Sequence, residues 1–161
     1  KEQEKFDEAI VCYNKVLSIK PYYANAYYNM GNALKDQDKF DKAILSYHKA
    51  LSIKPDYADA YYNIGIALKK QHKPEEAIEA YKKALSIKPD YADAYYNMGA
   101  IFQDQSKPEE AIAAYIKVLS TKPDEEMART QKLHQQGLIC DWDSIAAVSY
   151  THLTLPTTPY V

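Results

Sequence analysis

Apolar residues recur along most of the chain at the spacing of amphipathic helices. Within residues 58–89, Ile64 and Leu68 lie on one helical face, and a second run with the same period follows a polar turn at residues 70–73. Pro74 comes directly after that turn, and proline suits the first turn of a helix because it has no N–H to leave unpaired. The pattern therefore predicts two helices joined by a short turn.

This helix pair repeats along the chain with a fixed period. Gly31, Gly65 and Gly99 lie 34 residues apart. Three further sets share that spacing: Pro21, Pro55, Pro89 and Pro123; Tyr13, Tyr47, Tyr81 and Tyr115; and the pairs Tyr27–Tyr28, Tyr61–Tyr62 and Tyr95–Tyr96. A period of this length predicts an all-α solenoid, in which each unit packs on its neighbours, and the prolines are expected to end each second helix.

The repeated glycines fall in the middle of the first predicted helix of each unit. Glycine there costs about 1 kcal/mol relative to alanine, so its repetition predicts close approach of the partner helix. We expect one column of large rings to fill the neighbouring space, namely Tyr27, Tyr61 and Tyr95.

Two helix boundaries are also predicted. Ser106 and Glu109 have the spacing of a capping box, in which each side chain bonds an exposed amide of the other. After Pro123 the period fails, and a polar helix is expected to end near His134, before Gly137.

Charge and composition exclude several classes of protein. The 161 residues include 20 Lys and Arg and 22 Asp and Glu, so a net charge of −2 provides no basic field for nucleic acid. No segment approaches the roughly 20 apolar residues of a membrane helix, and the N-terminus has no apolar region typical of a signal peptide. We therefore expect a soluble cytoplasmic protein that binds neither nucleic acid nor membrane.

The sequence offers no constellation for catalysis, and we expect no cofactor or metal. Its glycines are too far apart for a phosphate-binding loop, and its four histidines form no metal-binding pair. Cys12 lies on an apolar helix face and is predicted to be a small core residue, whereas Cys140 lacks a neighbouring cation that would lower its pKa. This chain is therefore not expected to be an enzyme.

The repeated motif resembles the tetratricopeptide repeat family. The family pattern of an aromatic residue, Leu-Gly, an aromatic, Ala, an aromatic and Pro has these counterparts in the central unit: Tyr61, Ile64-Gly65, Leu68, Ala77, Tyr81 and Pro89. The flanking units match at equivalent positions, although Tyr replaces the usual Trp. The resemblance implies a right-handed superhelix of antiparallel helix pairs that binds proteins or peptides.

In that family the first helices line a concave groove that receives an extended peptide or a partner helix. Carried over by position, the groove residues are Asn29, Asn63 and Asn97; Tyr28, Tyr62 and Tyr96; Asn25, Asp59 and Asp93; Asn32, Ile66 and Ala100; and Lys35, Lys69 and Gln103. A column of Asn amides suits an extended backbone, since each amide donates and accepts. The same amides could instead tie helices together, and that alternative stays open. Because Tyr and Asp occupy the relevant columns, a basic clamp for a C-terminal carboxylate is not expected.

We predict four segments: a partial repeat with only its second helix (1–21), three repeats (22–123), a capping junction (124–147) and a tail (148–161). The chain is thus expected to be a fragment. Its junction, including Ile139-Cys140-Asp141-Trp142, resembles that of O-linked N-acetylglucosamine transferase-like proteins, which implies a parent with a glycosyltransferase domain absent here. The alternatives are a stand-alone assembly scaffold and a repeat array fused to some other catalytic domain. The tail resembles a translated sequencing adapter and is excluded from fold reasoning.

Overall fold

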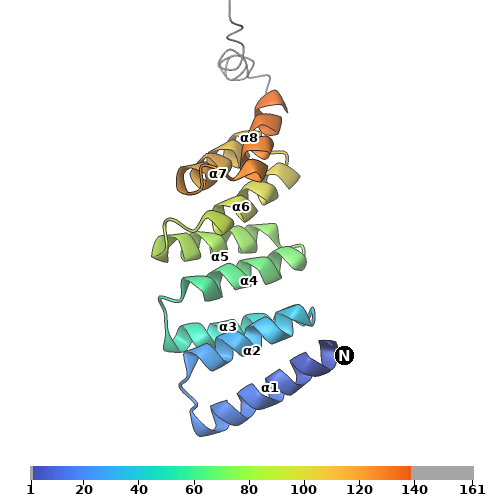
Figure 1. The fold of residues 1–161 in the computed structure, drawn as a ribbon, viewed down its shortest axis with the longest axis vertical. Helices are drawn as coiled ribbons and strands as arrows, with labels where there is room; N and C mark the ends of the chain where they lie inside the picture. The colour runs from blue at the N-terminus through green and yellow to red at the C-terminus, as the bar shows by residue number, and fades with distance from the viewer. Residues whose placement is uncertain (1, 139–161) are drawn as a thin grey trace, which may run out of the picture. The chain divides into compact units, whose positions relative to one another are not determined.

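The computed structural model describes residues 2–138, and every regular element within that range is an α-helix (Figure 1). The helices are α1 (Glu2–Ile19), α2 (Ala24–Asp36), α3 (Phe40–Ile53), α4 (Ala58–Lys70), α5 (Pro74–Ile87), α6 (Ala92–Asp104), α7 (Pro108–Thr121) and α8 (Glu126–Leu138). The predicted all-α class is confirmed. The junction motif at 139–142 and the tail at 148–161 lie outside the described residues.

The chain divides into two compact units, Lys1–Ala94 and Tyr95–Val161. In the first unit, each of the helices α1 to α4 packs against the next in sequence, and consecutive helices run in opposite directions (Figure 1). The helices α2 and α4, which are the first helices of successive repeats, also contact each other. In the described part of the second unit, α7 packs against α8.

Glycine and tyrosine fit together at the centre of each helix pair. A Cβ atom added to Gly31 would lie 2.5 Å from the ring of Tyr47, and one added to Gly65 would lie 2.5 Å from the ring of Tyr81. The second unit repeats this fit between Gly99 and Tyr115. The predicted close approach of the two helices at each glycine is therefore confirmed.

The prediction of which rings fill this space was wrong. Tyr27, Tyr61 and Tyr95 are only half-buried, whereas the rings against the glycines belong to the second helices and are almost fully buried. The sequence pattern directs both columns of tyrosines, those on the first helices and those on the second helices, toward the partner helix. The angle at which the two helices cross decides which ring reaches the glycine. Tyr27 and Tyr61 instead lie beneath the amines of Lys49 and Lys83, at 5.6 and 5.8 Å from the ring centres.

The turn inside each repeat has one residue in the left-handed conformation. Asp38, His72 and Ser106 have φ angles of 56°, 58° and 57°. After His72, the N–H of Lys73 donates to the carbonyl of Leu68, which closes the end of α4 in a Schellman motif.

The predicted capping box is consequently wrong. Ser106 belongs to the turn that ends α6, and Lys107 precedes α7 without any side-chain hydrogen bond to the helix. The left-handed backbone of Ser106 satisfies the end of one helix and leaves the hydroxyl out of position for the next.

Proline positions agree with the predicted boundaries. Pro74 begins α5, and α3, α5 and α7 each end two residues before a proline. By contrast, α8 continues through Gly137 to Leu138, beyond the end predicted near His134. The added Cβ of an alanine at position 137 would meet no atom within 4 Å, so this glycine does not mark a close approach.

A glutamine in the turn after each first helix bonds to the preceding second helix. The side-chain amide of Gln37 donates to the carboxylate of Asp7 at 2.9 Å, and that of Gln71 donates to Asp41 at 2.8 Å. These two Gln–Asp bridges are one repeat apart and link successive helix pairs in the first unit.

Cys12 is exposed, so its prediction as a core residue was wrong. The equivalent positions on α3 and α5 are Ser46 and Ala80, which are only 4% and 6% exposed. The first helices α2 and α4 pack against α3 and α5 and cover the helix face that carries Ser46 and Ala80. Among the described residues no helix precedes α1, so the face that carries Cys12 has no such cover.

Candidate binding surface on the first helices

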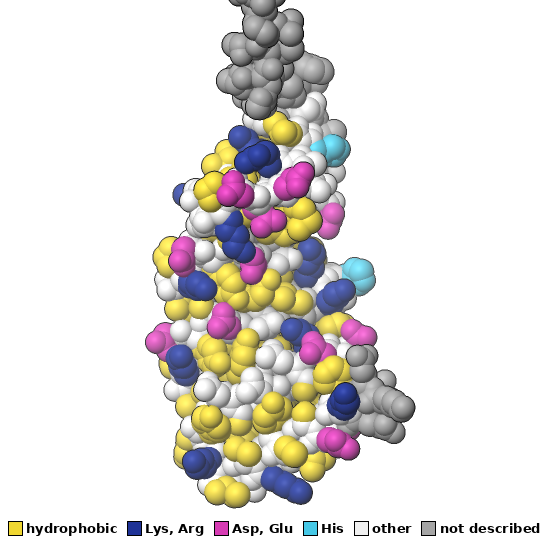
Figure 2. Space-filling view, in the orientation of Figure 1, with side chains coloured by type: hydrophobic (Ala, Val, Ile, Leu, Met, Phe, Trp, Pro, Cys, Tyr) yellow, Lys and Arg dark blue, Asp and Glu magenta, His cyan; other side chains and the backbone are white. Residues whose placement is uncertain are grey.

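The predicted groove residues of the first unit lie on α2, on α4 and at the start of α6, and we call those on α2 and α4 the first-helix surface. It comprises Asn25, Tyr28, Asn29, Asn32 and Lys35 from α2 and Asp59, Tyr62, Asn63, Ile66 and Lys69 from α4. In the view of Figure 2, hydrophobic side chains, tyrosine included, cover much of this unit, with charges of both signs between them.

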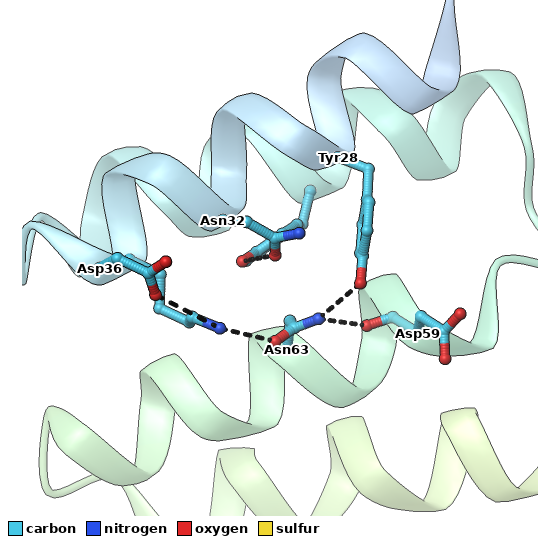
Figure 3. Close-up of polar contacts among 7 residues, drawn as sticks. Tyr28, Asn32, Asp36, Asp59 and Asn63 are labelled. Atoms are coloured by element: carbon cyan, nitrogen blue, oxygen red, sulfur yellow. Dashed lines mark hydrogen bonds and ion pairs between the residues drawn. The ribbon is translucent and has the colours of Figure 1, made fainter. Parts of the chain in front are cut away.

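Asn63 is the centre of a hydrogen-bond network that joins α2 to α4 (Figure 3). Its amide nitrogen donates to the Tyr28 hydroxyl and to the backbone carbonyl of Asp59, both at 3.0 Å. Its carbonyl oxygen accepts from the amine of Lys35 at 3.1 Å, and that amine also lies 3.8 Å from the carboxylate of Asp36. The structure thus brings Tyr28, Lys35, Asp59 and Asn63 together.

The three predicted ladder asparagines have different surroundings. Asn63 is only 7% exposed, and both hydrogens of its amide are already used within the chain. Asn29 is exposed, since α2 is the earliest first helix described and no Tyr or Lys from a preceding one reaches it; Asn97, in the second unit, is half-buried. Asn63 therefore ties two helices together, and the ladder as a peptide-binding element stays a prediction.

Aromatic pairs join the repeats beside this network. Tyr28 stacks on Tyr57 with ring centres 4.7 Å apart, and Tyr62 lies at the same distance from Tyr91. The Tyr91 hydroxyl donates to the carboxylate of Asp59 at 3.0 Å. Burial and the Asp59 contact together raise the pKa of Tyr91, so its hydroxyl remains a donor at neutral pH.

Sequence reasoning missed Tyr57 and Tyr91 as aromatic neighbours of this surface. The available signal was their 34-residue spacing, which also includes Tyr23. Each ring also has a lysine amine over it: that of Lys54 lies 4.7 Å from the Tyr57 ring centre, and that of Lys88 lies 4.6 Å from the Tyr91 ring centre.

The hydroxyl groups of the second-helix tyrosines differ between repeats. Tyr47 donates to the side chain of Asn32 at 2.8 Å, and in the second unit Tyr115 donates to Gln103 at 3.1 Å. The buried hydroxyl of Tyr81 has no hydrogen-bond partner, since Ile66 occupies the position of Asn32. Burial raises the pKa of all three phenols, that of Tyr115 to about 12.

The remaining predicted residues differ in exposure. Asn25 and Asp93 are exposed, and Lys69 is half-buried. In the second unit, Tyr96 is half-buried, with its ring centre 5.8 Å from that of Tyr115.

None of the predicted groove residues lines a shallow pocket of about 360 Å³ in the first unit. It is lined by His48 of α3, by three residues of α4 and by Glu75, Glu76, Glu79, Ala80 and Lys83 of α5. Across residues 2–138, no group of His, Cys, Asp and Glu could hold a metal ion, and no helix is long and apolar enough to cross a membrane.

Two models of one repeat family match consecutive parts of the chain. The model described as TPR repeat matches residues 1–38 and 31–72, and the one described as tetratricopeptide repeat matches residues 58–91 and 92–125. Together they extend over most of the sequence. The chain belongs to the tetratricopeptide repeat family. TPR units are scaffolds that bind proteins.

Solved TPR structures resemble this chain closely. A crystal structure of MamA is 31% identical with a TM-score of 0.76, over 82% of this chain and 77% of that one. A second MamA structure is 27% identical with a TM-score of 0.77, over 97% and 90% of the two chains. The first TPR of Spaghetti (RPAP3), bound to the HSP90 peptide SRMEEVD, is 26% identical with a TM-score of 0.68, over 73% of this chain and 93% of that one. No curated protein matches the sequence.

Proposed function

We propose that this TPR chain binds peptide segments of partner proteins through its first-helix surface. The observation that carries the proposal is the peptide-bound RPAP3 repeat, a structural relative that the chain matches over nearly all of the relative's length. The exposed amides of Asn25 and Asn29 would meet a peptide backbone, since an amide both donates and accepts. Neighbouring tyrosine rings add rigid contact area at a low entropy cost.

The charge on this surface favours a neutral or weakly basic peptide. Lys35 already contacts Asn63 and Asp36, and Asp59 adds an acidic group nearby. An acidic C-terminal peptide would therefore meet the carboxylate of Asp59 beside a lysine that is already engaged, and we expect SRMEEVD to bind this chain more weakly than micromolar.

Binding is tested by selecting uncharged 12-residue peptides from a phage-displayed library on the full chain. Fluorescence anisotropy of the synthetic peptides gives their affinity. Asn25→Ala with Asn29→Ala should weaken binding about tenfold, because two backbone hydrogen bonds would be lost. Asn14→Ala, at an exposed position on α1, is the matched control. No selected peptide, or equal loss in both variants, contradicts the proposal.

The finer proposal is that these repeats recruit substrates for an O-linked N-acetylglucosamine transferase-like parent. Its support is the Cys140-Asp141-Trp142 junction in the sequence. Reading the source transcript past the codon for Ala147 tests it, because a nucleotide-sugar-binding domain should follow. A stop codon there favours the alternative, a stand-alone assembly scaffold.

A further inference from the structure

One buried hydroxyl beneath the first-helix surface lacks a hydrogen-bond partner. The side chain of Tyr81 is 0% exposed, and its oxygen bonds no other group. Its ring lies against Gly65, and its centre is 5.8 Å from that of Tyr62, a residue of the surface. Packing therefore fixes the position of this hydroxyl, although the hydroxyl makes no hydrogen bond.

The neighbouring repeat identifies where this hydroxyl points. Tyr47, one repeat earlier, has the same contact with its glycine and donates to Asn32 of the surface. Ile66 replaces that asparagine in the second repeat, so the buried Tyr81 hydroxyl lies beneath a part of the surface where the chain supplies no acceptor. Buried polar groups are nearly always satisfied, which makes an unsatisfied donor at a binding surface informative.

We propose that the Tyr81 hydroxyl donates to a backbone carbonyl of the bound peptide, with Ile66 forming an apolar contact beside it. This inference rests on the proposed function and specifies one point of contact within it. Because burial raises the pKa of Tyr81, the phenol is protonated and can donate at neutral pH.

The carbonyl gains access by a movement of Ile66. This side chain is half-buried at the surface, and aliphatic side chains change rotamer without loss of hydrogen bonds. Once the peptide occupies the surface, the new hydrogen bond replaces an unsatisfied buried donor, so its contribution to affinity is larger than that of an exposed pair.

Removing the hydroxyl tests the proposal on the full chain. Tyr81→Phe should weaken the library-selected peptides about threefold to tenfold, which is the effect of one hydrogen bond. The variant deletes an atom with no partner in the free protein, so it should fold normally. Tyr13→Phe, at the equivalent position on α1, should leave the affinity unchanged. A second variant, Ile66→Asn, gives Tyr81 an internal acceptor and should weaken binding to the same extent.

A thioamide scan of the peptide locates the acceptor. Replacing one carbonyl oxygen with sulfur, a weaker acceptor, should reduce the affinity of the wild-type chain at a single position, and Tyr81→Phe should abolish that difference. If the wild type binds no selected peptide, the proposed function fails and this inference with it. If Tyr81→Phe binds as tightly as wild type, or no position is coupled to it, the inference alone is overturned.

Discussion

The repeats formed by α2–α3 and α4–α5 have the same apolar packing and different polar contacts. Gly31 and Gly65 meet the rings of Tyr47 and Tyr81 with nearly identical geometry. The polar residues beside those rings differ: Tyr47 bonds Asn32, whereas Tyr81 faces the position of Ile66 without a partner.

This difference separates the residues that hold the fold from those that distinguish one repeat from another. Packing needs only a small residue opposite a ring, so it repeats without change. Polar contacts depend on which side chains the preceding first helix provides, as Asn63 illustrates by using Tyr28 and Lys35. Variants at the two kinds of position should therefore behave differently.

The largest effect is expected where the repeats are alike. Gly65→Ala should lower the free energy of unfolding by about 2 kcal/mol, because the new methyl group overlaps a fully buried ring and outweighs the helix preference of alanine. Gly31→Ala should do the same.

Gly137→Ala is the matched control for this packing effect. Its methyl group meets open space within a helix, so it should raise stability by up to about 1 kcal/mol. Urea unfolding followed by circular dichroism measures all three variants. A Gly65→Ala protein stabilised as much as Gly137→Ala would refute the packing account.

The next largest effect should separate two asparagines in equivalent positions. Asn63→Ala removes a buried amide that accepts from Lys35 and donates to Tyr28, and should cost about 1.5 kcal/mol. Asn29→Ala, at an exposed site, should change stability by no more than about 0.5 kcal/mol. Equal losses in the same urea assay would mean that the asparagines act alike in every repeat.

Making the second repeat resemble the first should create a new interaction. In the Ile66→Asn background, Tyr81→Phe should cost about 1 kcal/mol, whereas in wild type it should cost nothing. The double-mutant cycle isolates this coupling from the packing of Ile66. A coupling energy of zero, measured by thermal unfolding, would place the Tyr81 hydroxyl away from position 66.

The smallest effect concerns the turns. His72→Gly should stabilise the chain by about 0.5 kcal/mol, since glycine adopts a φ of 58° without strain but loses more entropy on folding. His48→Gly, inside α3, should instead destabilise it by about 1 kcal/mol. A loss of stability in both variants would show that the left-handed turn carries no strain.

The helix pairs, their prolines and the close approach at each glycine were predictable from sequence because each depends on contacts within one repeat. The choice between Tyr61 and Tyr81 as the ring against Gly65 was not, since both face the partner helix and only the crossing geometry separates them. The predicted capping box at Ser106 failed because one residue cannot both end a helix with a left-handed φ and cap the next helix.

The candidate site was predictable as a set of positions and not as a set of roles. Equal spacing placed Asn29 and Asn63 in one column, but burial of Asn63 depends on the particular residues of α2. Equal spacing likewise placed Cys12 with Ser46, although only Ser46 has a first helix packed over it.

The Gln–Asp bridges give successive helix pairs the same junction. Gln37 bonds Asp7, and one repeat later Gln71 bonds Asp41, so the same hydrogen bond joins each helix pair to the one before it. A duplicated stretch of residues 40–73 inserted after Lys73 would thus meet only surfaces already complementary to it. Tandem duplication in the gene can lengthen such a protein in whole repeats, leaving each new copy free to acquire its own polar residues on an inherited core.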